Sequence, residues 1–395
     1  MVYFFPMKPC ALYVHIPFCA SRCSYCDFTT YAGVERLIPR YVRALRTEIE
    51  LLAGSREEKT ALASLYLGGG TPSLLSSRQI KELLDCIRVS FSLQQEAEIT
   101  LEANPGTVDS KYLGEIRTSG VNRLSLGVQT THPQQLRLLC RDHSPQDILR
   151  AVSSVREAGF DNLSLDLIYG LPEHSLLSWQ STVEQALALE PEHLSLYSLT
   201  VEPGTRLSGQ IERGVLSAPD ADTAAELLQW AAGRLRKAGL RQYELANWAL
   251  PGNHSRHNLA YWRMAPYLGV GAAAHGYGEG IRTENTADLG EYLRRLEKDS
   301  GRERSFPLTP ATAAWHRLTR QEEMEEVVIM GLRLTREGVS RGDFQHRFGV
   351  ELTEVYREPI ETLHRAGLLT WAGDRLLLTA RGRMLGNRVF VRFLT

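Results

Sequence analysis

Three cysteines, Cys19, Cys23 and Cys26, lie within the stretch FCASRCSYCDF. Zinc and iron sites usually take four protein ligands, and Phe28 occupies the position where a fourth cysteine could stand. A disulfide would leave one of the three thiols unpaired. A zinc ion would need a fourth ligand, and His15, on the preceding strand, is not expected to point toward the cysteines. A 4Fe–4S cluster can be held by three thiolates with one iron left open. The spacing therefore favours a cluster over zinc.

The chain up to residue 200 alternates strand-like and helix-like segments. Three strand-like segments share the triplet LSL, at 122–127, 161–166 and 192–197, and three more precede them: ALYVHIPF, ASLYLGGG and AEITLEANP. Helical periodicity is present at about 39–53 and 77–90, in PQDILRAVSSVREAG and in LLSWQSTVEQALALE. Strands that alternate with helices indicate parallel βα units, and six such units favour a barrel or partial barrel over a doubly wound sheet.

Polar or glycine-rich residues stand at the end of each expected strand. In parallel βα architectures, function gathers at the carboxyl ends of the strands. Any one of these residues could belong to an ordinary turn, but the set predicts a functional rim. Its members are the cysteine loop, GGGTP at 68–72, Glu102, Gln129, Asp166 and Tyr197.

The composition restricts the class of protein. A chain of 395 residues suggests two or three domains by length, although one barrel can take up most of it. The 45 basic and 46 acidic residues give a formal charge of −1, which is unlike a protein held to nucleic acid by charge. The first residues do not resemble a signal peptide, and no stretch has the ~20 apolar residues of a membrane span. The six cysteines do not form a secreted disulfide pattern, so we expect a cytoplasmic protein.

The cysteine spacing, with Tyr25 before the last cysteine, resembles the signature of radical S-adenosylmethionine (SAM) enzymes. In that family the amino and carboxylate groups of SAM chelate the open iron. The blocks LYVHIPFCASRCSYCDF, YLGGGTPS, LEANPGT, LSLGVQ, LSLDLIYGLP and YLGVGAAAHG are similar to the oxygen-independent coproporphyrinogen oxidase superfamily. This resemblance implies an α/β fold: a partial (β/α)6 barrel followed by a small helical domain.

The resemblance also implies roles for individual residues. Residues that match contacts of the cluster-bound SAM are Tyr13, Gly69, Gly70, Thr71 and Glu102, with the glycines letting backbone groups approach the methionyl end. Residues that match a second SAM site are Tyr25, Gln129, Arg141 and Asp166. An ion pair between Arg141 and Asp166 that closes the barrel rim is the structural alternative.

Two departures separate the sequence from the decarboxylating oxidases. They carry a further cysteine where this chain has Phe28, and a longer segment before the cluster loop than the 18 residues that precede Cys19 here. Both departures are those of the heme chaperone (HemW-like) branch, which binds heme and a SAM-chelated cluster and passes heme to an acceptor protein. A radical SAM methyltransferase acting on a porphyrin or heterocycle, or an oxidase, are the alternative functions, so enzymatic activity stays open. An electron donor such as a flavodoxin or ferredoxin is the implied redox partner.

The stretch HNLAYW at 257–262 matches a pattern of the chaperone branch. Histidine is the commonest proximal ligand of heme iron, and Tyr261 and Trp262 could stack on a porphyrin. The alternative, of about equal weight, is that His257 forms a hydrogen bond within a loop while the two aromatic side chains fill the core. His254 is a neighbouring candidate ligand.

We expect three regions along the chain: a barrel with cluster and SAM sites at 1–300, a linker at 301–319 and a C-terminal domain at 320–395. The C-terminal part has helical patterns at about 320–335, 340–347 and 352–366, and then strand-like GLLTWAG and RLLLTARG. This order is winged-helix-like. Mixed charge argues against DNA binding, and the family resemblance implies a cover over the barrel mouth.

Overall fold

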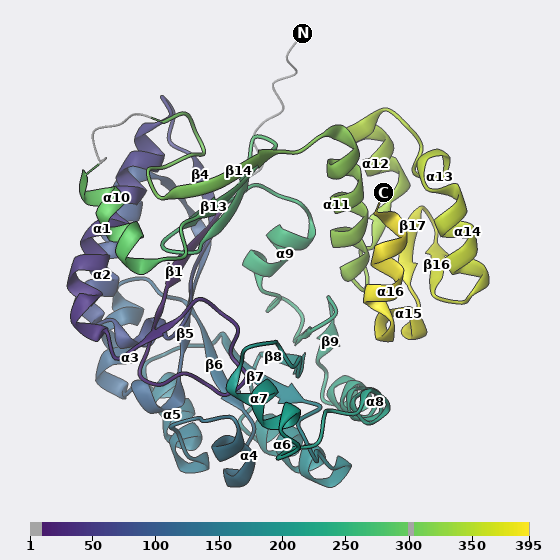
Figure 1. Ribbon diagram of the computed structural model, residues 1–395, viewed down its shortest axis with the longest axis horizontal. Helices are drawn as coiled ribbons and strands as arrows, with labels where there is room; N and C mark the ends of the chain where they lie inside the picture. Colours follow the sequence, from purple (N-terminus) through teal and green to yellow (C-terminus); the bar gives the residue numbers. More distant parts are fainter. Residues whose placement is uncertain (1–9, 299–303, 395) are drawn as a thin grey trace.

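The computed structural model describes residues 10–298 and 304–394, and within them twelve strands form one sheet (Figure 1). Its six central strands run parallel, as the repeat predicts. They are β1 (Cys10–Ile16), β4 (Ala61–Gly69), β5 (Ser92–Ala103), β6 (Arg123–Gln129), β7 (Leu163–Tyr169) and β8 (His193–Ser198).

Helices cover the outer face of these strands (Figure 1). Ser76 and Ser144 begin two of them with capping boxes, in which side chains satisfy backbone groups at the first turn. The helices of this layer are α1 (Ile38–Gly54), α2 (Ser77–Ser90), α3 (Ser110–Thr118), α5 (Pro145–Glu157), α6 (Leu176–Ala188) and α8 (Ala221–Lys237). The short helices α4 (Pro133–Leu138) and α7 (Arg206–Glu212) lie instead near the cysteine loop, where the N–H of Leu207 donates to the Ser24 carbonyl (2.8 Å). No helix among the described residues has both the length and the apolar composition needed to cross a bilayer.

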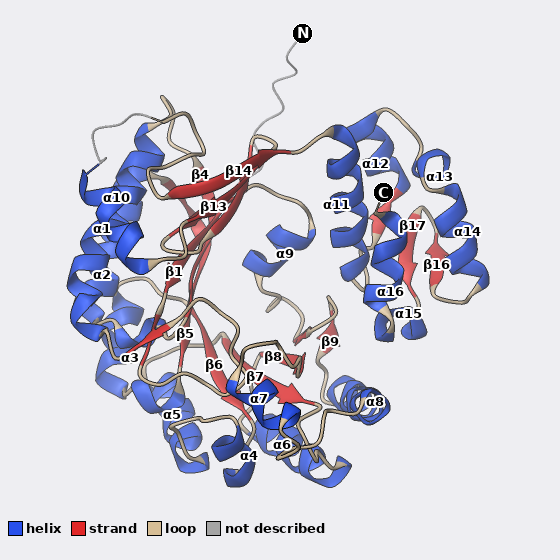
Figure 2. Ribbon diagram, in the orientation of Figure 1, coloured by secondary structure: helices blue, strands red, loops and turns tan. Residues whose placement is uncertain are grey.

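The sheet is open, so the barrel is partial as expected. Beside β1 it continues through the parallel β11 (Tyr267–Val270) and then through antiparallel strands; beside β8 it ends with two short strands. The added strands are β12 (His275–Gly278), β13 (Ile281–Asn285), β14 (Thr312–Arg317), β10 (Asn247–Ala249) and β9 (Arg241–Gln242). The short helix α9 (Arg256–Trp262) lies on the open side (Figure 2).

The remaining short elements connect or extend this layer. They are β2 (Phe18–Cys19), β3 (Tyr31–Ala32), α10 (Leu289–Lys298) and the single-turn helices η1 (Glu35–Leu37), η2 (Pro72–Leu74) and η3 (Pro105–Thr107). The expectation of an irregular linker at 301–319 is wrong for its second half, because residues 312–317 form β14 and pair with β13. Residues 301–303 lie outside the described part of the chain.

The C-terminal region forms a domain with its own core and a three-stranded sheet, in the order β15-β17-β16. The expected helix at 352–366 is two helices, because Pro359 has no N–H with which to continue the hydrogen-bond ladder from the preceding turn. The elements are α11 (Arg320–Arg333), β15 (Val339–Ser340), α12 (Arg341–Phe348), α13 (Leu352–Val355), α14 (Arg357–Arg365), β16 (Leu369–Ala372), β17 (Arg375–Leu378), α15 (Ala380–Met384), α16 (Gly386–Phe390) and η4 (Val391–Phe393).

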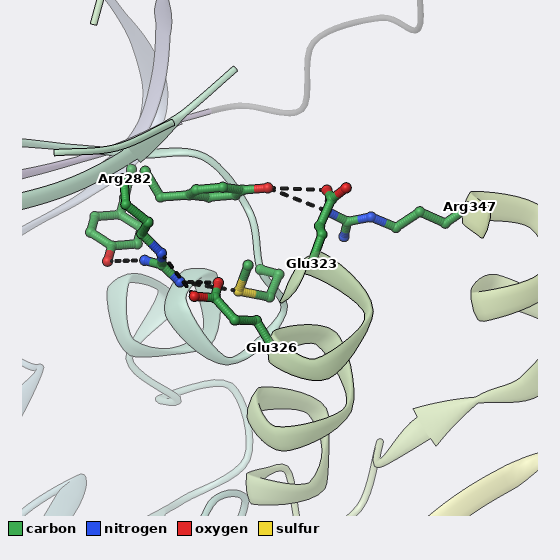
Figure 3. A network of polar contacts seen from close by, with 7 residues as sticks. Arg282, Glu323, Glu326 and Arg347 are labelled. Carbon is green, nitrogen blue, oxygen red and sulfur yellow. Dashed lines mark hydrogen bonds and ion pairs between the residues drawn. The ribbon is translucent and has the colours of Figure 1, made fainter. Parts of the chain in front are cut away.

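A polar network joins this domain to the barrel (Figure 3). Arg282 on β13 forms an ion pair with Glu326 on α11, and its side chain also donates to the hydroxyl of Tyr267 (2.5 Å). Close by, Arg347 on α12 pairs with Glu323. Because the members of the first pair are only about a quarter exposed, at 24% and 27%, water screens it less than a surface pair. The network therefore fixes α11 against the extended edge of the sheet.

A buried carboxylate, Glu48 on α1, ties the outer layer to this same edge. Its oxygens accept hydrogen bonds from the Gly271 N–H (2.8 Å), Asn285 Nδ2 (2.7 Å), the Tyr292 hydroxyl (2.6 Å) and the Thr309 hydroxyl (2.9 Å). Burial raises the pKa of Glu48, whereas these four donors act in the opposite direction. Glu48 is thus the common acceptor for four segments that are distant in sequence.

We predict that Glu48→Ala lowers the free energy of unfolding by about 3 kcal/mol or more, because it leaves four buried donors without an acceptor. Thermal denaturation followed by circular dichroism measures the effect. The matched control is Glu50→Ala, which removes an exposed carboxylate two residues further along the same helix and should change little. Equal melting temperatures for the two variants would contradict the role of Glu48.

Candidate functional site

A cavity of about 470 Å³ lies at the carboxyl ends of the parallel strands; we call it the cysteine cavity. It brings together eleven of the thirteen residues singled out from the sequence. They are Cys19, Tyr25, Cys23, Cys26, Gly69, Gly70, Thr71, Glu102, Gln129, Arg141 and Asp166. Tyr197, from the end of β8, lines it as well. The strand-end argument therefore located the rim correctly.

Backbone hydrogen bonds fix the start and the middle of the cysteine loop against its neighbours. The N–H of Gly70 donates to the Ile16 carbonyl (2.8 Å), and the N–H of Thr71 donates to the Phe18 carbonyl (2.8 Å). In the middle of the loop, the Ser24 N–H donates to the Leu139 carbonyl (3.1 Å). The three thiols are consequently held on a defined path over the strand ends.

Each of the three thiols has a polar neighbour. Arg141 Nη1 lies 3.3 Å from the sulfur of Cys23, the Thr71 hydroxyl lies 3.7 Å from that of Cys19, and the Thr30 hydroxyl lies 4.0 Å from that of Cys26. Burial raises the pKa of Cys19 and of Cys26. A raised pKa means that burial disfavours the thiolate form. A bound metal centre would offset this effect, because thiols that coordinate a metal are deprotonated outright.

Cys19, Cys23 and Cys26 all line the cysteine cavity. Among residues 10–298 and 304–394, no group of three or more His, Cys, Asp or Glu side chains is placed to hold a single metal ion. In a 4Fe–4S cubane each thiolate binds a different iron. The assignment of the three thiols to a cluster stays a prediction. All six cysteines are free thiols, as expected for a chain without a disulfide framework.

The glycine turn after β4 is required by the fold itself, which corrects the expectation that it serves only a cofactor. A Cβ atom at Gly70 would lie 2.6 Å from the Phe18 carbonyl oxygen and 3.1 Å from the sulfur of Cys19. At Gly69, which has φ of +113°, a Cβ atom would lie 2.5 Å from the His15 ring. Both glycines therefore permit the close approach of the cysteine loop to the end of β4.

Glu102 presents its carboxylate at the cavity wall. It accepts hydrogen bonds from the Tyr66 hydroxyl (2.7 Å) and from the Gly69 N–H (3.0 Å). Burial raises the pKa of Glu102 to about 7, and the nearby Asp166 adds to the increase. A positively charged ligand group at this wall would favour the ionised form.

Arg141 and Asp166 do not form the ion pair considered as the structural alternative. Arg141 Nη2 donates to the Gly127 carbonyl (2.7 Å), and its other terminal nitrogen contacts Cys23. Asp166 accepts from the Ser125 hydroxyl (2.9 Å) instead. The two charges thus occupy separate places on the cavity wall, which leaves both available to a ligand.

Gln129 carries two signs of a functional position. Its backbone has φ of +67°, an uncommon conformation for a residue with a side chain, at an irregularity in the pairing of β6 with β7. Its buried side-chain oxygen has no hydrogen-bond partner in the described part of the chain. An unsatisfied amide at the wall of a cavity suits a polar ligand.

Tyr13 lines a second cavity, also about 470 Å³, and its hydroxyl is 3.0 Å from His15 Nδ1. We call this space the aromatic cavity, after the side chains of Tyr13, Phe28, Tyr261, Trp262 and Tyr267 in its lining. Asp27 and Phe28 line both cavities. Tyr13 also stacks on Tyr66, which donates a hydrogen bond to Glu102, so it stays close to one residue of the cysteine cavity. Its contact with SAM stays a prediction.

His257 is placed as the packing alternative describes. Its side chain is 1% exposed, and its ring nitrogens lie 3.0 Å from the Ser64 hydroxyl and 2.8 Å from the Tyr261 hydroxyl. Burial lowers the pKa of His257 to about 3, with the Arg123 charge as a second cause. Because both nitrogens are engaged inside the protein, a bond to iron would require the ring to give up one of these contacts. Heme ligation by His257 stays a prediction.

Among the residues of the cysteine cavity that sequence reasoning did not single out is a fourth thiol. Cys140 lines this cavity and has φ of +54°. Arg206 Nη1 lies 3.5 Å from its sulfur. No spacing rule connects Cys140 to the other cysteines, because the loop after α4 reaches the cavity only through the fold.

The residues that line the cysteine cavity all come from positions 19–202, so the C-terminal domain does not line it. That domain contributes Met330, on α11, to the aromatic cavity. The expected cover over the barrel mouth stays a prediction.

Comparison with known families and structures agrees with this geometry. The model described as the radical SAM superfamily matches residues 13–186, and the model described as the HemN C-terminal domain matches residues 318–385. The solved structure of coproporphyrinogen III oxidase (HemN) from Escherichia coli, described as a radical SAM enzyme, superposes with a TM-score of 0.85 at 25% identity. The match covers 99% of this chain and 91% of that one.

Relatives of known name match over nearly the whole length. The chain is 37% identical over 383 residues to the heme chaperone HemW of Bacillus subtilis (strain 168), covering 97% of this chain and 98% of the relative. It is 34% identical to the heme chaperone HemW of Escherichia coli (strain K12), with 98% and 99% covered. It is 38% identical to the mitochondrial radical S-adenosyl methionine domain-containing protein 1 of Mus musculus, with 93% and 86% covered.

We predict that Cys19→Ser, Cys23→Ser and Cys26→Ser each abolish an oxygen-sensitive 4Fe–4S cluster after anaerobic reconstitution, because each removes one of three thiolates. Iron and sulfide content and the visible absorbance measure the loss. Cys140→Ser is the matched control, a thiol of the same cavity that should be dispensable. Loss of the cluster in Cys140→Ser would instead identify a fourth thiolate ligand, and normal absorbance in Cys23→Ser would contradict the prediction.

We further predict that Gly70→Ala lowers the melting temperature of the metal-free protein, since its Cβ atom meets backbone oxygens that cannot move away separately. A cost of about 1–3 kcal/mol is expected for such crowding. Gly114→Ala is the control, because a Cβ atom there meets nothing within 4 Å inside α3. If Gly70→Ala melts like the wild type and only ligand binding is lost, the turn serves the ligand alone.

Proposed function

The chain belongs to the HemW heme chaperone family of the radical SAM superfamily, and we propose on this premise that it binds heme and transfers it to an acceptor protein. The observation that carries the proposal is identity of 34–38% to several heme chaperones over nearly the entire chain. Family membership of this kind implies a 4Fe–4S cluster and SAM.

Cys19, Cys23 and Cys26 would hold the cluster. The cavity that they line and the polar neighbour at each sulfur support this assignment. Such a cluster, with SAM on its open iron, supplies one-electron chemistry when bound. The chain's own contribution is to fix three thiolates through the backbone contacts of the cysteine loop, and to leave one side of the site open to the cavity.

The cavity wall offers complementary groups for SAM. Glu102 would accept hydrogen bonds from an amino group, and a cationic partner would favour its ionised form. The free oxygen of Gln129 would take a further donor, while Arg141 would meet a carboxylate. Asp166 and Tyr25 lie across the same cavity, where the family resemblance places a second SAM molecule.

Heme is the cargo in this proposal rather than a group to be changed. The position that holds an additional cysteine in the decarboxylating oxidases is Phe28 here, and its ring is 68% exposed between the two cavities. An acceptor protein for heme and an electron donor such as a flavodoxin or ferredoxin complete the proposal, which places the protein in a reducing compartment such as the cytoplasm.

We predict that the full chain takes up one heme per chain after anaerobic reconstitution. It should not convert SAM to S-adenosylhomocysteine, and it should not form a vinyl-bearing product from coproporphyrinogen. Absorbance titration with heme, followed by product analysis, tests this expectation. The Cys19→Ser variant should still bind heme, since its defect lies at the cluster. Failure of heme uptake would overturn the proposal, and either product would assign the chain to a methyltransferase or an oxidase.

A further inference from the structure

The aromatic cavity lies where the open side of the barrel faces the C-terminal domain. Its walls come from six separate elements: β1, α9, β11, β12, β13 and, from the C-terminal domain, α11. Only Asp27 and Phe28 are common to this cavity and the cysteine cavity. A space of about 470 Å³ falls within the range of small-molecule sites and lies outside the cluster site already described.

The lining suits a flat, largely apolar ligand. Five aromatic side chains surround the space, and such rings bind planar groups by stacking or edge contacts. Trp262 also offers a hydrogen-bond donor, because its buried indole N–H has no acceptor among the described residues. One face of the Trp262 ring is covered by Arg333, whose guanidinium lies 4.3 Å from the ring centroid. The indole is therefore held in place by the C-terminal domain while its N–H lacks a partner.

Of the two histidines that line the aromatic cavity, only His275 has a ring without a hydrogen bond to described residues. His15 lines the cavity too, but its nitrogens lie 3.0 Å from the Tyr13 hydroxyl and 3.1 Å from the Thr29 carbonyl oxygen. Both ring nitrogens of His257 contact hydroxyl groups, those of Ser64 and Tyr261. His275, at the start of β12, is exposed and lines the cavity with no such contact. A neutral imidazole with a free nitrogen is the ordinary protein ligand of heme iron.

We propose that the aromatic cavity is the heme site of this chain, with His275 as the iron ligand. The proposal rests on the heme-carrying function proposed above and gives that function a location distinct from the cysteine cavity. The charged lining residues are Asp27, Arg282 and Glu284, and Arg282 is already paired with Glu326. The heme propionates are therefore directed toward solvent rather than into the cavity.

At this location the C-terminal domain would contribute to heme binding. Met330 and the covered Trp262 connect the site to α11, and Arg282 connects the cavity wall to the same helix. Movement of the domain away from the barrel would open the site at one side. On the other side, heme would contact Phe28, two residues after Cys26.

The test is an absorbance titration of the reconstituted full chain with heme and, separately, with metal-free protoporphyrin. His275→Ala should shift the Soret band and weaken heme binding at least tenfold, while metal-free porphyrin binding is kept because only the iron bond is lost. Ala287→Trp, which fills the cavity from an exposed lining position, should weaken both ligands. His316→Ala is the matched control: an exposed histidine on β14 outside both cavities, expected to leave both titrations unchanged. Melting temperatures establish that each variant is folded.

Two results would overturn the heme site, and a third would reject only its iron ligand. Unchanged heme affinity and Soret position in both His275→Ala and Ala287→Trp would mean that heme binds elsewhere, with the carrier function intact. A loss of SAM affinity in these variants, with heme binding unaffected, would assign the cavity to the nucleoside end of SAM. Unaltered heme binding in His275→Ala together with loss in Ala287→Trp would keep the cavity but reject the ligand. Failure of the wild type to bind heme would count against the proposed function itself.

Discussion

The close approach of the cysteine loop to the end of β4 is the constraint on which the site depends. Two backbone hydrogen bonds, from Gly70 to Ile16 and from Thr71 to Phe18, continue the pairing of β1 with β4 beyond the regular sheet. Side chains at positions 69 and 70 would prevent this contact. The same turn directs the Thr71 hydroxyl toward Cys19 and the Gly69 N–H toward Glu102. One stretch of backbone thus positions both the thiols and the carboxylate opposite them.

The open barrel explains why the chain has two cavities instead of one. The parallel strands alone define the cysteine cavity, whereas the aromatic cavity needs the added strands at one edge, α9 and the C-terminal domain. Glu48 holds part of this edge to α1 through four hydrogen bonds, and Arg282 holds it to α11. The two connections fall on opposite sides of the extended sheet. The aromatic cavity therefore depends on contacts that are absent from a minimal radical SAM barrel.

Sequence patterns predicted the secondary-structure elements that depend on residues close together in the chain. Periodicity and caps located the central strands and the helices between them, and the rule that parallel strands end at one rim brought eleven site residues together. Long-range partners could not be predicted in this way. His257 meets Ser64, a residue 193 positions earlier, and Arg141 meets Cys23 rather than Asp166. The strand at 312–317 was missed because its surroundings are charged and irregular, while its stability comes from pairing with β13.

Phe28 shows how one position can separate two functions on the same fold. Related oxidases carry a cysteine there, which would present a thiol beside the cluster. Here the side chain is an exposed aromatic ring shared by both cavities. The exchange removes a polar, redox-active group and supplies part of an apolar wall. A substitution of that kind suits a protein that must hold a porphyrin near its cluster without reacting with it.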